Sequence, residues 1–286
     1  MFKILKAIVR RIIWKLNDVL SLLGFSLILL NVTDLRGLHL SRRTSANDIQ
    51  LLLGQLRPIK NGHDLIRVGG AQDGGYLIPN DLTGVIRCLS AGCDLNWTFE
   101  KSLYSIFGVP SSILDSEDKR PSDLGAEQDY IPKWLGNEDS STTISFRSWI
   151  ASNTKDSGAD LVLQMDIEGF EWEALAAIDL DSLDKFRVIS IEFHSIQNLY
   201  NERLFQKIYS PVIQKLLLSF DVVHIHPNNC CGTTNFGDFE FPNIFELTLH
   251  RRDRSKGNFG YTKLPSSLDV RNVQSNPEVF INWIDG

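Results

Sequence analysis

Short apolar runs alternate with amphipathic stretches along most of the chain after residue 65. The runs rich in β-branched and aromatic residues predict strands at residues 85–90, 111–114, 142–146, 161–165, 188–193, 221–225 and 244–250. Helical spacing of apolar residues predicts helices near 98–107, 147–153, 171–177 and 202–218. Strands alternating with helices are typical of βαβ units around a mostly parallel sheet. The last strand follows a loop without room for a crossover helix, so we expect it to run antiparallel to its neighbour.

The first 60 residues predict a helical extension that precedes a single domain over residues 61–286. Residues 1–16 carry apolar positions at helical spacing and five basic side chains, which favours an amphipathic helix. The apolar run 19–30 is too short for a comfortable membrane span and lacks a signal-peptide cleavage site. We expect a loop at 31–43 and a helix at 45–56. The first helix either packs on protein or binds an anionic membrane surface, and the sequence leaves both open.

Composition narrows the class of partners. The chain has 286 residues, 22% of them charged, and a net charge of −6, so a basic footprint for nucleic acid is absent from its overall balance. Four cysteines are too few for a disulfide framework, and neither pair has zinc-ribbon spacing. We therefore expect reduced thiols in a cytoplasmic protein. The alternative is a cytoplasmic protein that contacts the inner face of the membrane through residues 1–30.

Acidic residues follow three of the predicted strands: Asp94, Asp115 and Asp166. A lone acid after a strand is usually a turn or cap residue. Three of them on the edge where open α/β sheets bind ligands favour a binding role. An acid at the end of the second strand can accept hydrogen bonds from both ribose hydroxyls of an adenosyl cofactor, which makes Asp115 the first candidate.

The turn after the first strand reads Ser-Ala-Gly-Cys-Asp and holds a single glycine, Gly92. A loop that cradles phosphates needs several glycines to bring its backbone close to the ligand. The turn therefore disfavours NAD and ATP, and with them a nicotinamide-dependent oxidoreductase.

The segment 163–175, LQMDIEGFEWEAL, resembles the K-x-D-x-E-G-x-E signature of FkbM-type methyltransferases. Asp166, Glu168, Gly169 and Glu171 match that signature, and Gln164 stands at the lysine position. Other stretches resemble the methyltransferase-like branch of the same family: R-x-G-x-x-x-D-G-G-Y at 67–76, the Phe-Glu helix start at 99–100, IEFH at 191–194 and HIHPNN at 224–229. The resemblance covers roughly residues 65–255.

The resemblance implies a Rossmann-like class I methyltransferase sheet, mostly parallel with a closing antiparallel strand, that uses S-adenosylmethionine. It also implies O-methylation of a saccharide or another small or lipid-linked metabolite. This cofactor has no phosphate, so a turn with one glycine suffices. The residues that we expect to bind it are Ser90, Gly92, Asp94, Glu100, Asp115 and Asp166.

Methyl transfer is an in-line displacement in which the protein positions the acceptor and removes a hydroxyl proton. The candidate catalytic residues near the strand ends are Asp166, Glu192 and His194, since a histidine titrates near neutral pH. The candidate substrate-binding residues are Glu168, His226 and Asn228. For each histidine the alternative is a structural role, as a cap or in an ordinary turn.

Two further alternatives stay open at this stage. No metal ligand is assigned, although Asp166, Glu192 and His194 or His226 could converge on a divalent ion. The second alternative is a catalytically silent module that keeps the fold and docks on a membrane or partner through its basic N-terminal helix. The Asp-Gly-Gly sequence at 73–75 predicts a tight turn, with folding over the cofactor as a second interpretation.

Overall fold

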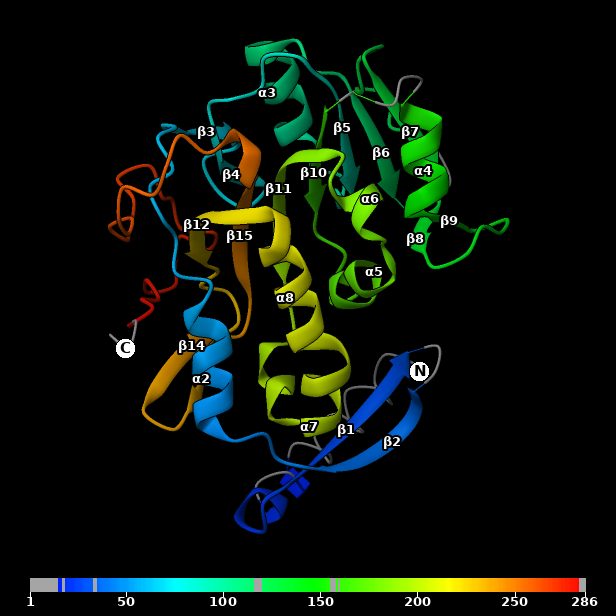
Figure 1. Ribbon diagram of the computed structural model, residues 1–286. Helices are drawn as coiled ribbons and strands as arrows, with labels where there is room; N and C mark the ends of the chain where they lie inside the picture. The colour runs from blue at the N-terminus through cyan, green and yellow to red at the C-terminus, as the bar shows by residue number, and fades with distance from the viewer. Residues whose placement is uncertain are drawn as a thin grey trace.

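The computed structural model describes residues 15–16, 19–32, 35–115, 120–154, 158 and 160–282, arranged around a seven-stranded sheet (Figure 1). The strand order across the sheet is β12-β15-β11-β10-β5-β6-β7. The strands are β5 (Val85–Ala91), β6 (Ser111–Asp115), β7 (Gln128–Pro132), β10 (Asp160–Met165), β11 (Phe186–Phe193), β12 (Phe220–Pro227) and β15 (Phe245–Arg251).

Six of the strands predicted from the sequence lie in this sheet. β10 pairs in parallel with both β5 and β11, and β6 pairs in parallel with β5 and β7. β15 is antiparallel to both β11 and β12, which confirms the orientation expected for the closing strand. The observed fold is therefore the predicted α/β fold with a mostly parallel sheet.

The predicted strand at 142–146 is wrong as a member of the main sheet. Residues Thr143–Ser145 form β9, which pairs with β8 (Trp134–Gly136) in a separate two-stranded sheet. The edge position of the main sheet belongs instead to β7. Its sequence, QDYIP, contains two polar residues and a proline, so it lacks the apolar signal of the central strands. An edge strand pairs on one side only and tolerates such a sequence.

The helices follow the predicted periodicity closely. They are α2 (Ala46–Gly54), α3 (Thr98–Phe107), α4 (Phe146–Asn153), α5 (Glu171–Ala177), α6 (Leu180–Leu183), α7 (Glu202–Leu204) and α8 (Ser210–Ser219). Three single-turn segments complete them: the 3-10 helices η1 (Ile196–Tyr200) and η3 (Arg252–Arg254), and the π-helix η2 (Phe205–Tyr209). The long helix predicted at 202–218 is thus divided into α7, η2 and α8.

The N-terminal region differs from the prediction. Strands β1 (Phe25–Val32) and β2 (Leu35–Arg42) form an antiparallel hairpin where the sequence predicts a helix end and a loop. The hairpin projects from the domain beside α7 (Figure 1). Residues 38–41 alternate apolar and polar, and an apolar run as short as 25–30 fits a strand as well as a helix. The predicted amphipathic helix and its membrane contact fall mainly on residues 1–14, which lie outside the described residues.

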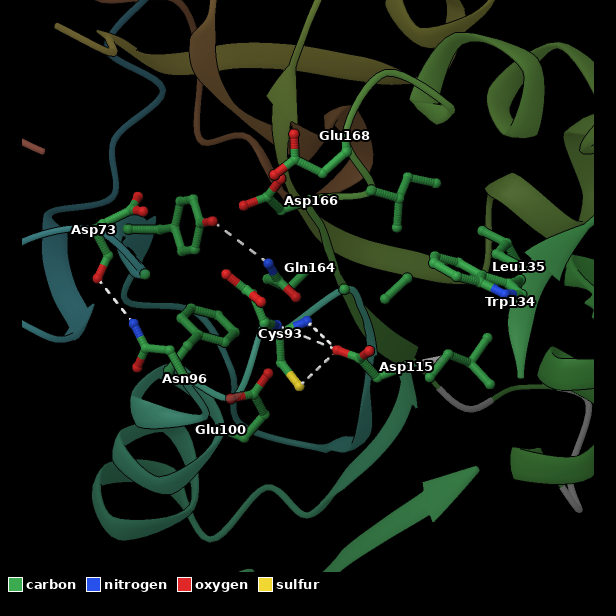
Figure 2. A pocket seen from close by; sticks show the side chains of 18 of the residues that line it. Asp73, Cys93, Asn96, Glu100, Asp115, Trp134, Leu135, Gln164, Asp166 and Glu168 are labelled. Atoms are coloured by element: carbon green, nitrogen blue, oxygen red, sulfur yellow. Dashed lines mark hydrogen bonds between the residues drawn. The ribbon is translucent and has the colours of Figure 1, made fainter. Parts of the chain in front are cut away.

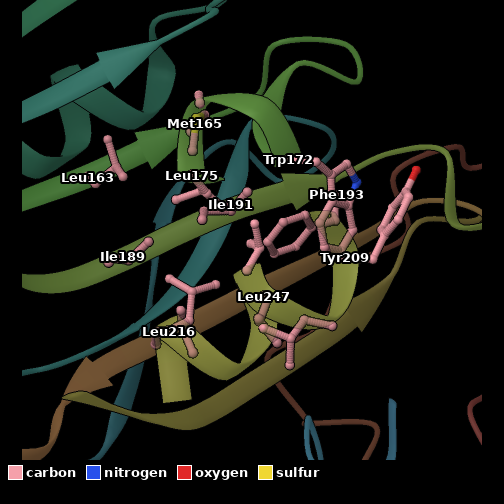
Figure 3. Packing of buried hydrophobic residues seen from close by; sticks show 14 of the residues in the cluster. Leu163, Met165, Trp172, Leu175, Ile189, Ile191, Phe193, Tyr209, Leu216 and Leu247 are labelled. Atoms are coloured by element: carbon pink, nitrogen blue, oxygen red, sulfur yellow. The ribbon is translucent and has the colours of Figure 1, made fainter. Parts of the chain in front are cut away.

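The two faces of the sheet have different covers. One face packs against α2, α4, α5 and α8 in the larger apolar cluster. Figure 3 shows the part of this cluster under α5 and α8. The other is covered by α3 and by the hairpin of β3 (Leu65–Gly69) and β4 (Gly75–Pro79), with a smaller apolar cluster between them. A third hairpin, β13 (Thr233–Phe236) and β14 (Phe239–Pro242), connects β12 to β15.

Two smaller observations complete the fold. Cys230 and Cys231 are joined in a vicinal disulfide, which corrects the expectation that all four thiols are reduced. Cys88 and Cys93 carry free thiols. In the part of the chain that the structure describes, no helix combines the length and apolarity needed to cross a membrane.

Candidate active site

The main pocket lies where the strand order of the sheet reverses, between β5 and β10. Parallel strands in open α/β sheets bind ligands at their carboxyl ends at such a switch point. The cavity has a volume of about 430 Å³ and is lined by residues that follow β5, β6 and β10 (Figure 2). A volume of this size accommodates a small organic ligand. Its wall includes Gly92, Asp94, Glu100, Asp115 and Asp166, which are five of the six predicted cofactor-binding residues.

The turn after β5 has one position, Gly92, that requires a glycine. Gly92 has a φ of +76°, and a Cβ at this position would lie 1.8 Å from the backbone oxygen of Asp166. No side chain fits there, because the two turns touch through their backbones. Asp115 holds the same turn: its Oδ2 accepts hydrogen bonds from the backbone N–H of Cys93 at 3.0 Å and of Asp94 at 3.2 Å. The acid at the end of β6 therefore holds the turn that follows β5, and Gly92 in that turn contacts the end of β10.

Behind the pocket, buried polar side chains form a chain across β5 and β10. The Ser90 hydroxyl lies within hydrogen-bond distance of Glu100 and, at 2.7 Å, of the Gln164 side-chain oxygen. The Gln164 amide donates to the Tyr76 hydroxyl at 3.4 Å. Ser90, the sixth predicted residue, is thus buried behind the wall and acts on the pocket through Glu100. Gln164 occupies the lysine position of the family signature with a neutral hydrogen-bonding group.

Glu100 is the carboxyl group in this series of buried polar side chains. Its Oε2 has no hydrogen-bond partner among the described residues, and burial raises the pKa of the carboxyl group. Since Glu100 also lines the cavity, this oxygen belongs to a group placed where it can meet a ligand. An ammonium group of a ligand would satisfy it, because buried charged groups require a partner.

The pocket is strongly acidic. Among the described residues, six carboxyl side chains and one lysine, Lys133, line the pocket. The acids are Asp73, Asp94, Glu100, Asp115, Asp166 and Glu168. Such a wall attracts cationic ligands and repels phosphates. Asp73 and Gly74 come from the turn between β3 and β4, so the Asp-Gly-Gly turn forms one edge of the pocket (Figure 2).

Beside the pocket, the ends of β10 and β11 bring the three predicted catalytic residues together. We call Asp166, Glu168, Glu192 and His194 the acidic corner. His194 Nε2 lies 3.9 Å from Asp166 Oδ1, 3.7 Å from Glu192 Oε1 and 3.7 Å from Glu168 Oε2. These distances are too long for hydrogen bonds. They leave a small space between the four groups.

Glu171, at the start of α5, fixes the imidazole from behind. Its Oε1 lies 3.1 Å from His194 Nδ1 and accepts hydrogen bonds from the backbone N–H groups of Ile167 and Gly169. Trp172 Nε1 donates to the backbone oxygen of His194 at 2.8 Å. The signature Asp-Ile-Glu-Gly-Phe-Glu-Trp therefore supplies both the acids of the corner and the support for its histidine.

The pKa values of the corner are displaced by burial and by neighbouring charge. Burial raises the pKa of Asp166 to about 7, although His194 opposes that change. Burial and the carboxylates of Asp166 and Glu246 raise the pKa of Glu192 well above its ordinary value. Burial alone would lower the pKa of His194, but its contact with Glu171 raises it. Displacements of this kind, caused by burial together with specific charged neighbours, are typical of acid–base sites.

The predicted substrate-binding residues lie around the corner in different roles. Glu168 is on the pocket wall with its side chain 86% exposed. Asn228 donates to Glu192 Oε1 at 3.0 Å. His226 lies 3.5 Å from Glu246 Oε2. The histidine that lies close to both Asp166 and Glu192 is His194.

Sequence reasoning missed two polar residues next to the corner. Glu246 of β15 lies directly opposite Glu192 in the antiparallel pair, and an acid inside an otherwise apolar strand was a signal for it. Asn272 comes from the C-terminal segment and donates to Glu246 Oε1 at 2.7 Å. No pattern in the sequence marked that asparagine.

A second cluster of titratable groups has a structural arrangement. Asp81 receives two hydrogen bonds from Arg254, and His250 Nε2 lies 3.2 Å from the same carboxylate. Arg187 lies 3.8 Å from Asp81 as well. Two guanidinium groups already neutralise this acid, and they would repel a metal ion.

Several solved structures resemble the chain at low similarity. A fibrillarin/Nop5p complex is 11% identical, with a TM-score of 0.35, over 59% of this chain and 73% of that one. The methyltransferase CalO6 is 10% identical, with a TM-score of 0.30, over 59% of this chain and 58% of that one. The Pnkp1/Rnl/Hen1 complex is 12% identical, with a TM-score of 0.31, over 85% of this chain and 47% of that one. The strand order, not these scores, establishes the fold.

No curated protein matches this chain. A family model does match it: residues 92–215 match the methyltransferase FkbM domain. The matched segment begins at the glycine of the β5 turn and ends in α8, so it contains most of the pocket wall and the whole acidic corner. It confirms the family that the sequence signature predicted. The chain is therefore similar, over residues 92–215, to the methyltransferase FkbM domain.

Proposed function

We propose that the protein transfers a methyl group from S-adenosylmethionine to a hydroxyl group of a polar acceptor such as a saccharide. The observation that carries this proposal is the direct contact between the acidic pocket at the switch point and the corner of Asp166, Glu192 and His194. The pocket suits a cationic cofactor, and the corner suits an acceptor that must lose a proton.

The residues of the wall fit S-adenosylmethionine by charge and by position. When bound, this cofactor supplies an electrophilic methyl group on a sulfonium centre. Asp115, at the end of β6, is placed to accept hydrogen bonds from ribose hydroxyls, as acids at this position do in dinucleotide sites. The buried Glu100 offers an unpartnered oxygen to an ammonium group. Six wall carboxyls against one lysine disfavour a phosphate-bearing cofactor.

The acidic corner supplies the acceptor side of the reaction. Asp166 belongs to both the pocket wall and the corner, so an acceptor at the corner lies next to the methyl donor's site. The acceptor oxygen forms the new bond to the methyl carbon while the carbon–sulfur bond breaks and its electrons stay on sulfur. The hydroxyl proton leaves to the corner, whose raised pKa values suit a proton acceptor near pH 7.

The first test is calorimetric titration of the full chain with S-adenosylmethionine and S-adenosylhomocysteine. We expect saturable binding of both, and a loss of about tenfold or more in affinity in Asp115→Ala, because hydrogen bonds to a charged group contribute about 1.5–3 kcal/mol each. Asp238→Ala, an exposed carboxylate in the β13–β14 turn, is the matched control and should bind as the unmodified chain does. A folded sample that binds neither compound would favour the silent module instead.

The acceptor class is tested by methyl transfer from labelled cofactor to panels of saccharides, other small alcohols and lipid-linked glycans. We expect His194→Ala to lower turnover by about a hundredfold, a typical value for loss of a general base, while the cofactor affinity is unchanged. If this variant kept full turnover on an identified acceptor, the corner would not be the catalytic site.

A further inference from the structure

The space inside the acidic corner has the dimensions of a cation site. The ligand atoms of Asp166, Glu192 and His194 all lie within 4.8 Å of one another. His194 Nε2 is 3.7–3.9 Å from three carboxylate oxygens without a hydrogen bond to any of them. Ligands that are about 2.1 Å from a shared cation lie about 3–4.2 Å apart in octahedral coordination. The distances from His194 Nε2 to Asp166 Oδ1 and Glu192 Oε1 are of that size.

The orientation of His194 is that of a metal ligand. Glu171 Oε1 already accepts two backbone N–H groups, and it faces His194 Nδ1 at 3.1 Å, so Nδ1 is the donor. The neutral imidazole then presents the lone pair of Nε2 to the corner. A carboxylate behind the ring, fixing the tautomer and direction of the imidazole, is the common support of metal-binding histidines.

Unpartnered buried oxygens give a second, independent indication of a missing ligand. Glu192 is 4% exposed, and its Oε2 has no hydrogen-bond partner among the described residues. Asn272 is 8% exposed; its amide donates to Glu246 and Asp73, while its own Oδ1 has no partner. A buried polar atom without a partner is costly, and native structures keep few of them.

Among the described residues, the ion-pair partners of these acids are imidazoles: His194 lies near Asp166 and Glu192, and His226 lies 3.5 Å from Glu246 Oε2. Glu192 has Asp166 on one side and Glu246 on the other, and Glu246 and Asp73 close a second group with it. Across the described ranges of the chain, no lysine or arginine forms an ion pair with any of these four acids. This distinguishes the corner from Asp81, which two arginines neutralise.

We propose that Asp166, Glu192 and His194 bind a divalent cation, of the Mg²⁺ or Mn²⁺ class, that completes the acceptor site. Two carboxylates and one imidazole suit these ions, and three protein ligands leave coordination positions open. Its role rests on the proposed function and changes one step of it: with the cation bound, Asp166 and His194 are ligands rather than proton acceptors, the cation polarises the acceptor hydroxyl, and exposed Glu168 passes the released proton to water. The binding of the cation itself does not depend on that function.

The test is titration of the chelator-stripped full chain with Mn²⁺, followed by the electron paramagnetic resonance signal of the free ion. We expect one saturable Mn²⁺ per chain, competed by Mg²⁺. Glu192→Gln and His194→Ala should each weaken this binding by about tenfold or more. Glu138→Gln, an exposed carboxylate outside the corner, is the control and should leave it unchanged. Circular dichroism establishes that each variant is folded.

The outcomes separate this inference from the proposed function. An unmodified chain that binds S-adenosylmethionine but no Mn²⁺ or Mg²⁺, or a Glu192→Gln variant that binds Mn²⁺ as well as the unmodified chain does, overturns the cation site alone. A chain that binds Mn²⁺ but not S-adenosylmethionine overturns the methyl transfer and leaves the cation site standing. In a working assay, chelator should abolish turnover and Mn²⁺ should restore it.

Discussion

The two faces of the central sheet are both buried and yet differ in chemistry. On the face under α5 and α8, consecutive alternate positions of β11 are Ile189, Ile191 and Phe193, which pack with Trp172 and Tyr209 (Figure 3). On the opposite face of the same strand lie Ser190 and Glu192, also buried. Central strands buried on both faces are usually apolar throughout. The alternation in β11 therefore shows that burial alone does not determine its sequence.

The segment that covers the polar face, β4 and the residues after it, provides hydrogen-bond partners for it. Thr248 of β15 donates to the backbone oxygen of Leu77 in β4 at 2.7 Å, and His250 reaches Asp81 just beyond that strand. Nearer the carboxyl end of β11, the acids Glu192 and Glu246 stand side by side; each accepts a hydrogen bond from an asparagine, and no described residue pairs with Glu192 Oε2. Places where a chain breaks the rule of satisfied buried groups are usually functional sites. The apolar face holds the fold together, and the polar face holds the chemistry.

The strongest test of this division is Phe193→Ala on the apolar face. Phe193 is fully buried, with ring centroids 4.3 Å from Trp172 and 5.4 Å from Phe245. We expect a loss of about 3–5 kcal/mol in the free energy of unfolding by urea, the usual cost of a large buried cavity. Phe280→Ala, at a side chain that is 57% exposed, should cost about 1 kcal/mol or less. Equal losses in the two variants would contradict the division.

The next effect concerns His250, on the polar face beneath Asp81. Burial lowers its pKa from 6.5 to about 4. Its folded pKa is below its unfolded value, so the unfolded chain takes up the proton first as the pH falls. Stability is therefore lost between about pH 6.5 and pH 4, by up to about 3 kcal/mol. Urea unfolding across that range should show this slope in the unmodified chain, and a shallower one in His250→Gln. Parallel slopes would exclude the assignment.

The sequence predicted the elements of the apolar face better than those at the edges of the fold. Strands β10 and β11 and helix α5 carry strong apolar periodicity, because their apolar side chains enter the larger core, and their predicted bounds match closely. β7 and the N-terminal hairpin were missed or misassigned. The first is a polar edge strand, and in the second a short apolar run fits either a strand or a helix.

The candidate site likewise contains residues that the sequence could place and residues that it could not. Acids at strand ends could be placed from the sequence, because the carboxyl ends of parallel strands share one edge. This brought Asp115 and Asp166 to the pocket and Glu192 to the corner. The partners from distant segments could not be placed: Asn272 reaches Glu246 after residues 255–271, which form no regular element that would predict its path. The choice between His194 and His226 likewise depended on the strand pairing.

A smaller effect is expected from Glu192→Gln. In the presence of chelator, this variant should gain about 1 kcal/mol in stability, because it removes one of the buried acids beside Asp166 and Glu246 while its side-chain oxygen still accepts from Asn228. With Mn²⁺ the order should reverse, since a ligand that binds only the folded state stabilises the unmodified chain. Glu138→Gln should be indifferent to both conditions. A variant that is less stable in chelator would show that the carboxylate has a compensating partner already.

The smallest effect is expected from Ser190→Ala, whose stability shows whether water is buried in the polar face. Ser190 is fully buried between β10 and β15, and no residue that the structure describes forms a hydrogen bond with its hydroxyl. If the face is dry there, Ser190→Ala removes an unsatisfied group and should leave the stability to urea unchanged or raise it by about 0.5 kcal/mol. Ile191→Ala, one position along and on the apolar face, should cost about 2–5 kcal/mol. A loss above about 1 kcal/mol in Ser190→Ala would mean that a buried water satisfies the hydroxyl. Solvent would then reach under the hairpin as far as the middle of β11, and the acids nearer its end would be less desolvated than the cation site requires.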